Sequence, residues 1–225
     1  MYLKKIYLSF FIDEVTPTYG NRNVVEITKK SSMDRGDTAN ETHFRSTLHV
    51  GTHIDFPYHF YNDGQTMEDF PADFWFFEHP LFVEVKPQSL ILEQELIGAL
   101  DNLNGKGDAD ILIVKTGMCH IRNTRQYWEE NIGLSPAIYD YLLEKLPNVR
   151  ILGFDSISVS SFQHRDIGRL AHKKFLNPEK PVLLLEDMDL RNIGENSSSN
   201  ELIVVPLMIA GADGVPCTVL ASMKL

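Results

Sequence analysis

Short runs of apolar residues, separated by polar segments rich in Gly, Asn and Asp, recur along the whole chain. Runs of this kind predict strands, whereas apolar residues at helical spacing predict helices. Many strands and few helices predict a single α/β domain over residues 1–225, with a mixed, largely β centre. We expect strands at residues 2–12, 24–28, 43–55, 81–85, 111–115, 149–154, 181–186, 202–207 and 217–222, and helices at 92–103, 135–146 and 166–175.

Two polar segments are expected to connect these elements. Residues 31–40, interrupted by Gly36, predict a loop or a hairpin tip, and residues 196–200 predict a flexible loop. A third segment, residues 67–77, is unusually aromatic. Its rings can wall a substrate pocket, although aromatic side chains more commonly pack in a core, and the pattern leaves both interpretations open. The rings belong to Phe70, Phe74, Trp75, Phe76 and Phe77.

The segment from residue 46 to residue 61 adds candidate chemistry to the strand pattern. Its imidazole and carboxylate side chains all fall on odd positions: His49, His53, Asp55 and His59. Successive side chains of a strand point to opposite faces, so this spacing predicts that the first three share one face. Gly51 leaves room for an ion between the two histidines. Pro57 is expected to end regular strand pairing after Asp55, which places His59 in the turn beyond it.

Two imidazoles and a carboxylate form a ligand set suited to Zn²⁺ or Mn²⁺, with open positions for water. A helix would also bring His49 and His53 together at i and i+4, but the glycine, the proline and the β-branched residues of this segment favour a strand. The alternative is a half-exposed polar strand, or histidines satisfied within the core. Burying so many polar groups would require many separate hydrogen-bond partners, which favours the metal site.

Charge and cysteine content narrow the classes of partner and compartment. Lys and Arg total 21 against 31 Asp and Glu, a formal net charge of −10, which argues against nucleic acid or an anionic membrane as a partner. Cys119 and Cys217 are far apart and in no CxxC motif, so we expect reduced thiols in a cytoplasmic protein. The first apolar run is followed by Asp13 and Glu14 rather than a cleavage site, so it predicts a strand and not a secretory signal.

Several stretches of the chain resemble one known family. The sequence HVGTHIDFPYH at 49–59 resembles the signature of the metal-dependent cyclase family, which includes bacterial kynurenine formamidase and isatin hydrolase. The opening YLSFFIDEVTPTYG, the middle blocks KTGMCHIRN and LGFDSISVS, and the C-terminal PLMIAGADGVPCTVLA are similar to further parts of the family. The resemblance therefore extends over nearly the whole chain.

The resemblance implies a swivelling β/β/α-type α/β domain, a homodimer or homotetramer, and hydrolysis of small-molecule amides with one or two Zn²⁺ ions, or Mn²⁺. By position it implies that His49, His53 and Asp55 bind the first ion and that His59 transfers protons. Asp55 would bridge to a second ion held by His172 and Glu186. The segment between His172 and Glu186 looks about two residues longer than in close formamidases, and His164 is a rival for the second-site histidine. The chain also departs from the family at Ser160, where many members have Asp.

These features together predict a metal-dependent amidohydrolase acting on an aryl formamide such as N-formylkynurenine, or on a cyclic amide. A metal-activated water would attack the carbonyl, with His59 as the proton shuttle. A serine hydrolase is not indicated, because the chain has no GxSxG motif. The alternative of a different class is a non-catalytic metal-dependent small-molecule binding protein on the same fold. The sequence does not determine the substrate, and it leaves the choice between Zn²⁺ and Mn²⁺ open.

Overall fold

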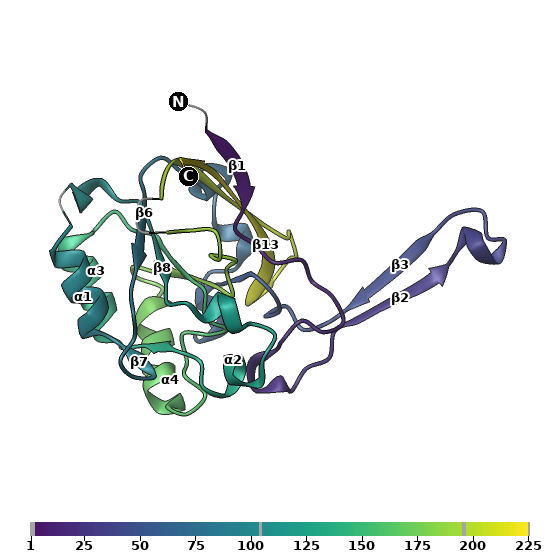
Figure 1. The fold of residues 1–225 in the computed structure, drawn as a ribbon, viewed down its shortest axis with the longest axis horizontal. Helices are drawn as coiled ribbons and strands as arrows, with labels where there is room; N and C mark the ends of the chain where they lie inside the picture. The colour runs from purple at the N-terminus through teal and green to yellow at the C-terminus, as the bar shows by residue number, and fades with distance from the viewer. Residues whose placement is uncertain (1–2, 104, 195–196, 225) are drawn as a thin grey trace.

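The computed structural model describes residues 3–103, 105–194 and 197–224 (Figure 1). Its strands are β1 (Lys4–Tyr7), β2 (Glu26–Ser31), β3 (Glu41–Arg45), β4 (His53–Asp55), β5 (Phe76–Phe77), β6 (Pro80–Glu84), β7 (Ile91–Leu92), β8 (Ile111–Lys115), β9 (Gly133–Leu134), β10 (Ile151–Phe154), β11 (Leu183–Glu186), β12 (Ser198–Pro206) and β13 (Gly214–Lys224). Its α-helices are α1 (Gln94–Asp101), α2 (Arg125–Glu129), α3 (Ala137–Lys145) and α4 (Arg165–Phe175). Short 3₁₀ turns are η1 (Tyr19–Asn21), η2 (Met33–Arg35), η3 (Pro57–His59), η4 (Met67–Asp69), η5 (Ala72–Trp75), η6 (Lys106–Asp108) and η7 (Met118–Ile121).

One mixed sheet forms the centre of the fold, in the order β5-β12-β13-β4-β11-β10-β8-β6, with β1 paired to β13. Strands β6, β8, β10 and β11 run parallel to one another, whereas β4 is antiparallel to both β11 and β13. Residues of β12 and β6 lie close to each other, so the sheet curves back toward itself. The predicted α/β class with a mixed, largely β centre is confirmed.

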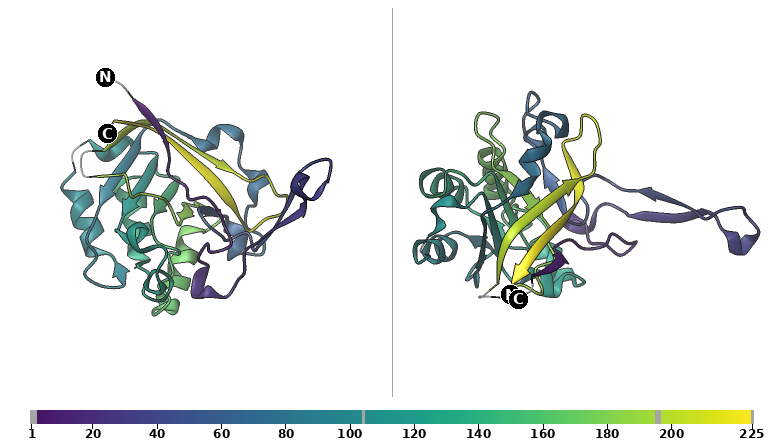
Figure 2. Two further views of the ribbon diagram at one scale, coloured as in Figure 1. Left: turned by 45° about the vertical axis from the view of Figure 1, so that its right-hand side comes forward. Right: turned by 90° about the horizontal axis from the view of Figure 1, so that it is seen from above.

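Strands β8, β10 and β11 are apolar except at their ends, as is typical of parallel strands that are covered on both faces. Every residue of β8, β10 and β11 is buried, and helices α1, α3 and α4 gather on one side of the molecule (Figures 1 and 2). Helix α4 buries Gly168, Ala171, His172 and Phe175, which follow one another at helical spacing on a single stripe. His172 therefore faces the interior as part of the packed side of a helix.

The strand predicted at residues 43–55 is wrong in its middle. Strand β3 ends at Arg45, a loop runs from residue 46 to residue 52, and β4 contains only His53, Ile54 and Asp55. Gly51 adopts the left-handed conformation, with φ 61°, which turns the chain. A Cβ there would lie 2.9 Å from Cγ1 of Ile12, so this glycine permits a turn and a close contact rather than leaving a gap for an ion.

Strands β2 and β3 form a separate hairpin, with η2 at its tip, that extends away from the body of the molecule (Figures 1 and 2). The hairpin tip predicted at residues 31–40 is therefore confirmed. Most side chains of the hairpin strands are exposed, including all five of β3. The sequence predicted neither the short helix α2 nor the β7–β9 pair.

Two further predictions differ at their ends. The flexible loop predicted at 196–200 is wrong for Ser198–Asn200, which belong to β12, and Asn196 lies outside the described residues. The first strand is shorter than residues 2–12, and Tyr2 also lies outside the described residues. The aromatic segment packs mainly in the core, where Trp75 and Phe77 are buried. Among the described residues, no helix has the length and apolar character needed to cross a membrane.

Candidate metal centre

Five separate elements bring the predicted site residues to one cavity of about 340 Å³. Strand β4 contributes His53 and Asp55, while His49 comes from the preceding loop and His59 from η3. Helix α4 and the end of β11 contribute the remaining two, His172 and Glu186. All six line the same cavity, so the structure brings every predicted site residue together.

The register of the sheet explains why β4 is at the centre of this cluster. His53 is paired with Glu186 across β11, and its Nε2 lies 3.4 Å from the Oε2 atom of that glutamate. Asp55 lies two residues further on the same face, as residues i and i+2 of a strand must. The alternation argument therefore applies to His53 and Asp55, whereas His49 reaches the cavity from the loop.

Asp55 lies between two groups of imidazoles. Its Oδ1 is 2.8 Å from His49 Nδ1 and 3.5 Å from His53 Nε2. Its other oxygen, Oδ2, is 3.6 Å from Nε2 of His172. A carboxylate can accept on both oxygens, so this buried side chain presents one oxygen to each group.

Backbone carbonyls determine which nitrogen two of the histidines turn toward the cavity. Nδ1 of His53 lies 2.8 Å from the carbonyl oxygen of Gly51, and Nδ1 of His172 lies 2.9 Å from that of Gly168. Because a carbonyl only accepts, each ring must donate through Nδ1, and in its neutral form it keeps a lone pair on Nε2. A partner on the far nitrogen of this kind is what orients metal-binding histidines.

The donor set fits a divalent cation. His49, His53 and Asp55 each offer one ligand atom, and these atoms all lie within 4.8 Å of one another. Imidazole nitrogen and carboxylate oxygen suit Zn²⁺ and Mn²⁺. On the other side of Asp55, Oε1 of Glu186 lies 3.9 Å from Nε2 of His172. The same oxygen accepts the backbone N–H of Val159 at 2.7 Å.

His172, and not His164, lines the cavity beside Asp55 and Glu186. His164 is exposed at the start of α4, and it belongs to none of the groups of ligand atoms found among the described residues. His172 is buried, and its Nδ1 lies 3.2 Å from Oγ of Ser160. Ser160, which stands where the resemblance implies an aspartate, therefore lies beside the site. Gly168 permits that approach, because a Cβ there would overlap the Ser160 side chain.

A buried ion pair lies directly behind Glu186. The next residue, Asp187, has a left-handed backbone with φ 53°, and its carboxylate accepts two hydrogen bonds from Arg122, at 2.8 and 2.7 Å. The hydroxyl of Tyr127 also donates to this carboxylate, and the hydroxyl of Thr52 donates to the Asp187 carbonyl. Since Thr52 precedes His53, one network holds the backbone next to both strands of the site.

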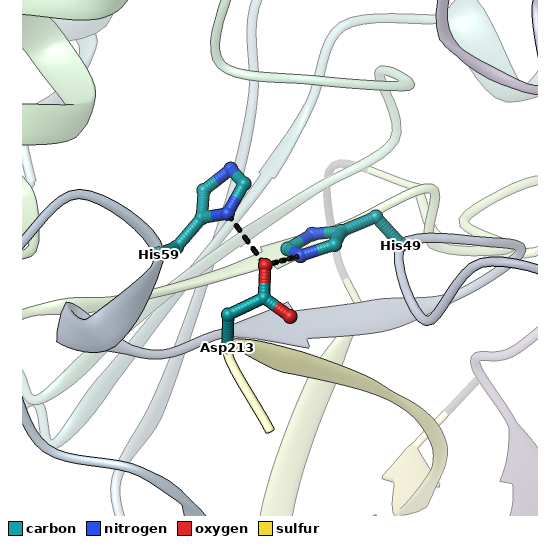
Figure 3. Close-up of side chains that lie close together, drawn as sticks. All are labelled: His49, His59 and Asp213. Carbon is teal, nitrogen blue, oxygen red and sulfur yellow. Dashed lines mark hydrogen bonds and ion pairs between the residues drawn. The ribbon is translucent and has the colours of Figure 1, made fainter. Parts of the chain in front are cut away.

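The sequence did not identify Asp213, which lies immediately before β13 (Figure 3). Its Oδ2 is 2.9 Å from Nε2 of His49 and 3.0 Å from Nδ1 of His59. The only local signal was the Gly-Ala-Asp-Gly turn, which is a common loop sequence. His49 and Asp213 are 164 positions apart in the chain, so only the folded structure reveals the contact.

The carboxylates of the site shift the pKa values of the residues they touch. Burial lowers the pKa of His49, but Asp55 and Asp213 outweigh it and raise this pKa to about 10. Hydrogen bonds from His49 and His59 hold the pKa of the Asp213 carboxyl well below its ordinary value. Burial raises the pKa of Asp55, but the neighbouring His49 lowers it further, so the net shift is downward.

Metal binding is therefore expected to release protons and to tighten as the pH rises. A metal ligand must be a neutral imidazole, whereas His49 with a pKa of about 10 is protonated at pH 7 in ion-free protein. We expect the affinity for Zn²⁺ to rise roughly tenfold per pH unit for each proton released. Calorimetric titration in buffers of different ionisation enthalpy measures the number of protons released per Zn²⁺ bound at pH 7. Binding without proton release would contradict the protonated His49.

The raised pKa of His49 makes metal affinity increase with pH, but it makes the stability of the ion-free protein decrease with pH. Because folding raises the pKa of His49, its contribution is fully present below the unfolded pKa of roughly 6.5 and is lost as the pH rises toward about 10. The lowered pKa values of Asp55 and Asp213 contribute stability above roughly pH 4, which is lost at lower pH.

Gly214 leaves space for the ring of His49. A Cβ at this position would lie 2.5 Å from Cε1 of His49 and 3.0 Å from its Nε2. We expect Gly214→Ala to displace the ring and weaken Zn²⁺ binding about 10–100-fold, as loss of an orienting contact does. Gly98→Ala is the matched control, because a Cβ there meets nothing within 4 Å. Competition with a chromophoric chelator measures both affinities, and equal values would contradict the steric role.

Comparison with known proteins adds a family and a fold to this geometry. The sequence model of the family described as "Putative cyclase" matches residues 6–161. A kynurenine formamidase from Salinibacter ruber is 28% identical over 172 residues, which cover 76% of this chain and 74% of that protein. Among solved structures, isatin hydrolase A from Labrenzia aggregata superposes with a TM-score of 0.80 at 20% identity, covering 98% of this chain and 93% of that one.

A further solved structure, described as a potential metal-dependent hydrolase with cyclase activity, has a TM-score of 0.76 at 21% identity, and each chain is covered to 97%. At these identities the two structural likenesses establish the fold alone. The family match covers more than half of the chain, so the resemblance inferred from the HVGTHIDFPYH signature is confirmed.

Proposed function

Because this chain belongs to the putative cyclase family, we propose that it is a metal-dependent hydrolase that cleaves an amide bond of a small molecule. The observation that carries the proposal is the position of Asp55, with one oxygen toward His49 and His53 and the other toward His172. Its sequence relatives include kynurenine formamidases, and its structural relatives include isatin hydrolases. Both kinds of relative support an amide substrate.

We assign one ion to His49, His53 and Asp55, and a second to Asp55, His172 and Glu186. Zn²⁺ is the first candidate and Mn²⁺ the second, on the nitrogen and oxygen donors present. A bound divalent cation supplies Lewis-acid chemistry that lowers the pKa of a water molecule to about 7. The protein contributes the orientation of its ligands, through the Gly51 and Gly168 carbonyls described above.

His59 is the proposed proton-transfer residue. Its Nδ1 is engaged by Asp213, and one of its ring nitrogens lies within 4.8 Å of ligand atoms of Asp55 and His172. An imidazole in this position can accept a proton from the attacking water and deliver it to the leaving nitrogen of the amide. Without that proton the amine would have to leave as an anion, which is why amide cleavage needs an acid.

The cavity beside these residues suits a small aromatic amide. Its volume of about 340 Å³ lies at the lower end of the range for small-molecule sites, roughly 300–1,000 Å³. Tyr19, Phe60 and Ile157 provide apolar lining, and Asn23 and Ser158 provide hydrogen-bonding groups. We therefore propose an aryl formamide such as N-formylkynurenine, or a cyclic amide such as isatin, as the substrate.

A substrate panel tests this function. Protein reconstituted with Zn²⁺ or Mn²⁺ is assayed with N-formylkynurenine, isatin and simple lactams, and each reaction is repeated after treatment with a chelator. We expect turnover of at least one compound, lost with the chelator and restored by the metal. Saturable binding of the compounds with no turnover under either metal would instead identify a non-catalytic metal-dependent binding protein.

The exposed hairpin β2–β3 bears on the oligomeric state of the protein. We propose a homodimer or homotetramer, because an isolated two-stranded hairpin such as β2–β3 is marginally stable without a surface to pack on. Light scattering of the eluted protein measures the mass directly, and a single chain of 25.7 kDa would contradict it.

We also propose a cytoplasmic location, since Cys119 and Cys217 are buried free thiols in the described part of the chain.

A further inference from the structure

One carboxylate oxygen connects the proposed metal-binding group to the proposed proton-transfer residue. Oδ2 of Asp213 lies 2.9 Å from Nε2 of His49 and 3.0 Å from Nδ1 of His59, and both rings point toward it (Figure 3). The centroids of the two rings are 4.2 Å apart. No step of the reaction described above uses this carboxylate.

The backbone holds Asp213 in place on both sides. Its carbonyl oxygen accepts the N–H of Phe56 at 3.0 Å, and the following Gly214 is paired with Asp55 in the β4–β13 register. The carboxylate is therefore fixed relative to the strand that carries two of the proposed metal ligands. Gly214 also allows the ring of His49 to lie against the backbone beside Asp213.

Asp213 fixes one proton position on each ring. A carboxylate only accepts, so His49 must donate through Nε2–H and His59 through Nδ1–H. In the ion-free protein Nδ1 of His49 also faces a carboxylate, that of Asp55 at 2.8 Å, so an ion bound there would displace the Nδ1 proton and leave the Nε2–H directed at Asp213. The lone pair of a neutral His59 is on Nε2, the nitrogen that Asp213 leaves open to accept a proton.

We propose that Asp213 is a positioning residue that sets the ring orientation and tautomer of both His49 and His59. This assignment rests on the proposed hydrolase function, because it gives each ring the nitrogen that its role requires. A carboxylate on the far nitrogen is a common means of orienting both metal-binding and proton-transferring histidines. Here a single side chain serves the two purposes.

The first test observes the tautomers directly. In full-length Zn²⁺-loaded protein labelled with ¹⁵N-histidine, long-range proton–nitrogen correlation spectra report which ring nitrogen carries the proton. We expect wild-type His59 to be protonated on Nδ1 and Asp213→Ala to move that proton to Nε2. Asp63→Ala, at an exposed turn position, is the matched control and should leave the spectrum of His59 unchanged. An unchanged His59 tautomer in Asp213→Ala overturns the proposal.

Elemental analysis of the same samples separates positioning from metal binding. His49, His59 and Asp213 also offer ligand atoms within 4.8 Å of one another, so they are a rival cluster for an ion. We expect Asp213→Ala to keep the wild-type number of bound ions, with affinity about 10–100-fold weaker. Loss of a whole equivalent of Zn²⁺ overturns the proposal in favour of a third ligand group.

Kinetics then distinguish failure of this assignment from failure of the proposed function. On any substrate that the wild type hydrolyses, we expect Asp213→Ala to lower kcat about 10–100-fold with a smaller change in KM, and Asp213→Glu to recover part of the loss. If no compound is hydrolysed but the His59 tautomer still moves, the function fails and the positioning stands. If the wild type is active and Asp213→Ala is equally active, the positioning alone fails.

Discussion

His59→Ala is expected to lower kcat about 10²–10⁴-fold while the protein keeps its bound metal. A ring nitrogen of His59 lies within 4.8 Å of ligand atoms of Asp55 and His172, and its Nδ1 is hydrogen-bonded to Asp213. Alanine removes the only imidazole that we assign to proton transfer, so the leaving nitrogen must take its proton from solvent. Steady-state kinetics on the best substrate of the panel, together with elemental analysis, measure both parts of this expectation.

His43→Ala is the control for that substitution, because His43 lies on the exposed hairpin strand β3 and pairs with Glu41. It should change neither kcat nor metal content. If His59→Ala instead loses an equivalent of metal, His59 is a ligand, as its grouping with Asp55 and His172 would allow. The proton-transfer role would then be wrong.

Arg122→Ala is expected to lower the free energy of unfolding by about 3–5 kcal/mol. Arg122 is 7% exposed and Asp187 is 1% exposed, and two hydrogen bonds join the guanidinium to the carboxylate. Removing the guanidinium leaves an uncompensated buried charge, whose desolvation cost is no longer offset by its partner. Urea denaturation followed by circular dichroism measures the change.

An exposed ion pair in the same region provides the comparison. Arg125 and Glu129 lie four residues apart on α2, and the arginine side chain is 77% exposed. Ion pairs of exposed side chains contribute little to stability, because solvent and salt screen them, so Arg125→Ala should be nearly neutral. The double substitution Arg122→Met with Asp187→Asn should recover much of the loss, since it removes both charges. A change below about 1 kcal/mol for Arg122→Ala would contradict the buried pairing.

The central strands could be predicted because burial on both faces leaves a clear sequence pattern. The runs at 111–115, 149–154 and 181–186 are apolar almost throughout, and they form β8, β10 and β11. The loop before β4 could not be predicted in the same way. Odd and even positions alternate in any sequence, and only the left-handed backbone of Gly51 shows that His49 has left the strand.

The cluster of His49, His53, Asp55 and His59 was identifiable from the chain because its members are close in sequence. The sequence alone could not separate His172 from His164. The packing of α4 does so, because it buries His172 toward the cavity and leaves His164 exposed. Asp213 lies in the Gly-Ala-Asp-Gly turn of the C-terminal block that resembles the family, but nothing in that turn marks it as a partner of His49 or His59. Its importance arises from a contact across 164 positions, which local patterns cannot encode.

Strand β4 is three residues long, yet it is the sole link in the sheet between β13 on one side and β11 on the other, within the described residues. Two of those residues are His53 and Asp55. Two of the proposed metal ligands therefore lie on the strand that joins the two halves of the sheet. A substitution in β4 can therefore change both the proposed metal site and the stability of the sheet. For variants of this strand, the free energy of unfolding should be measured together with turnover.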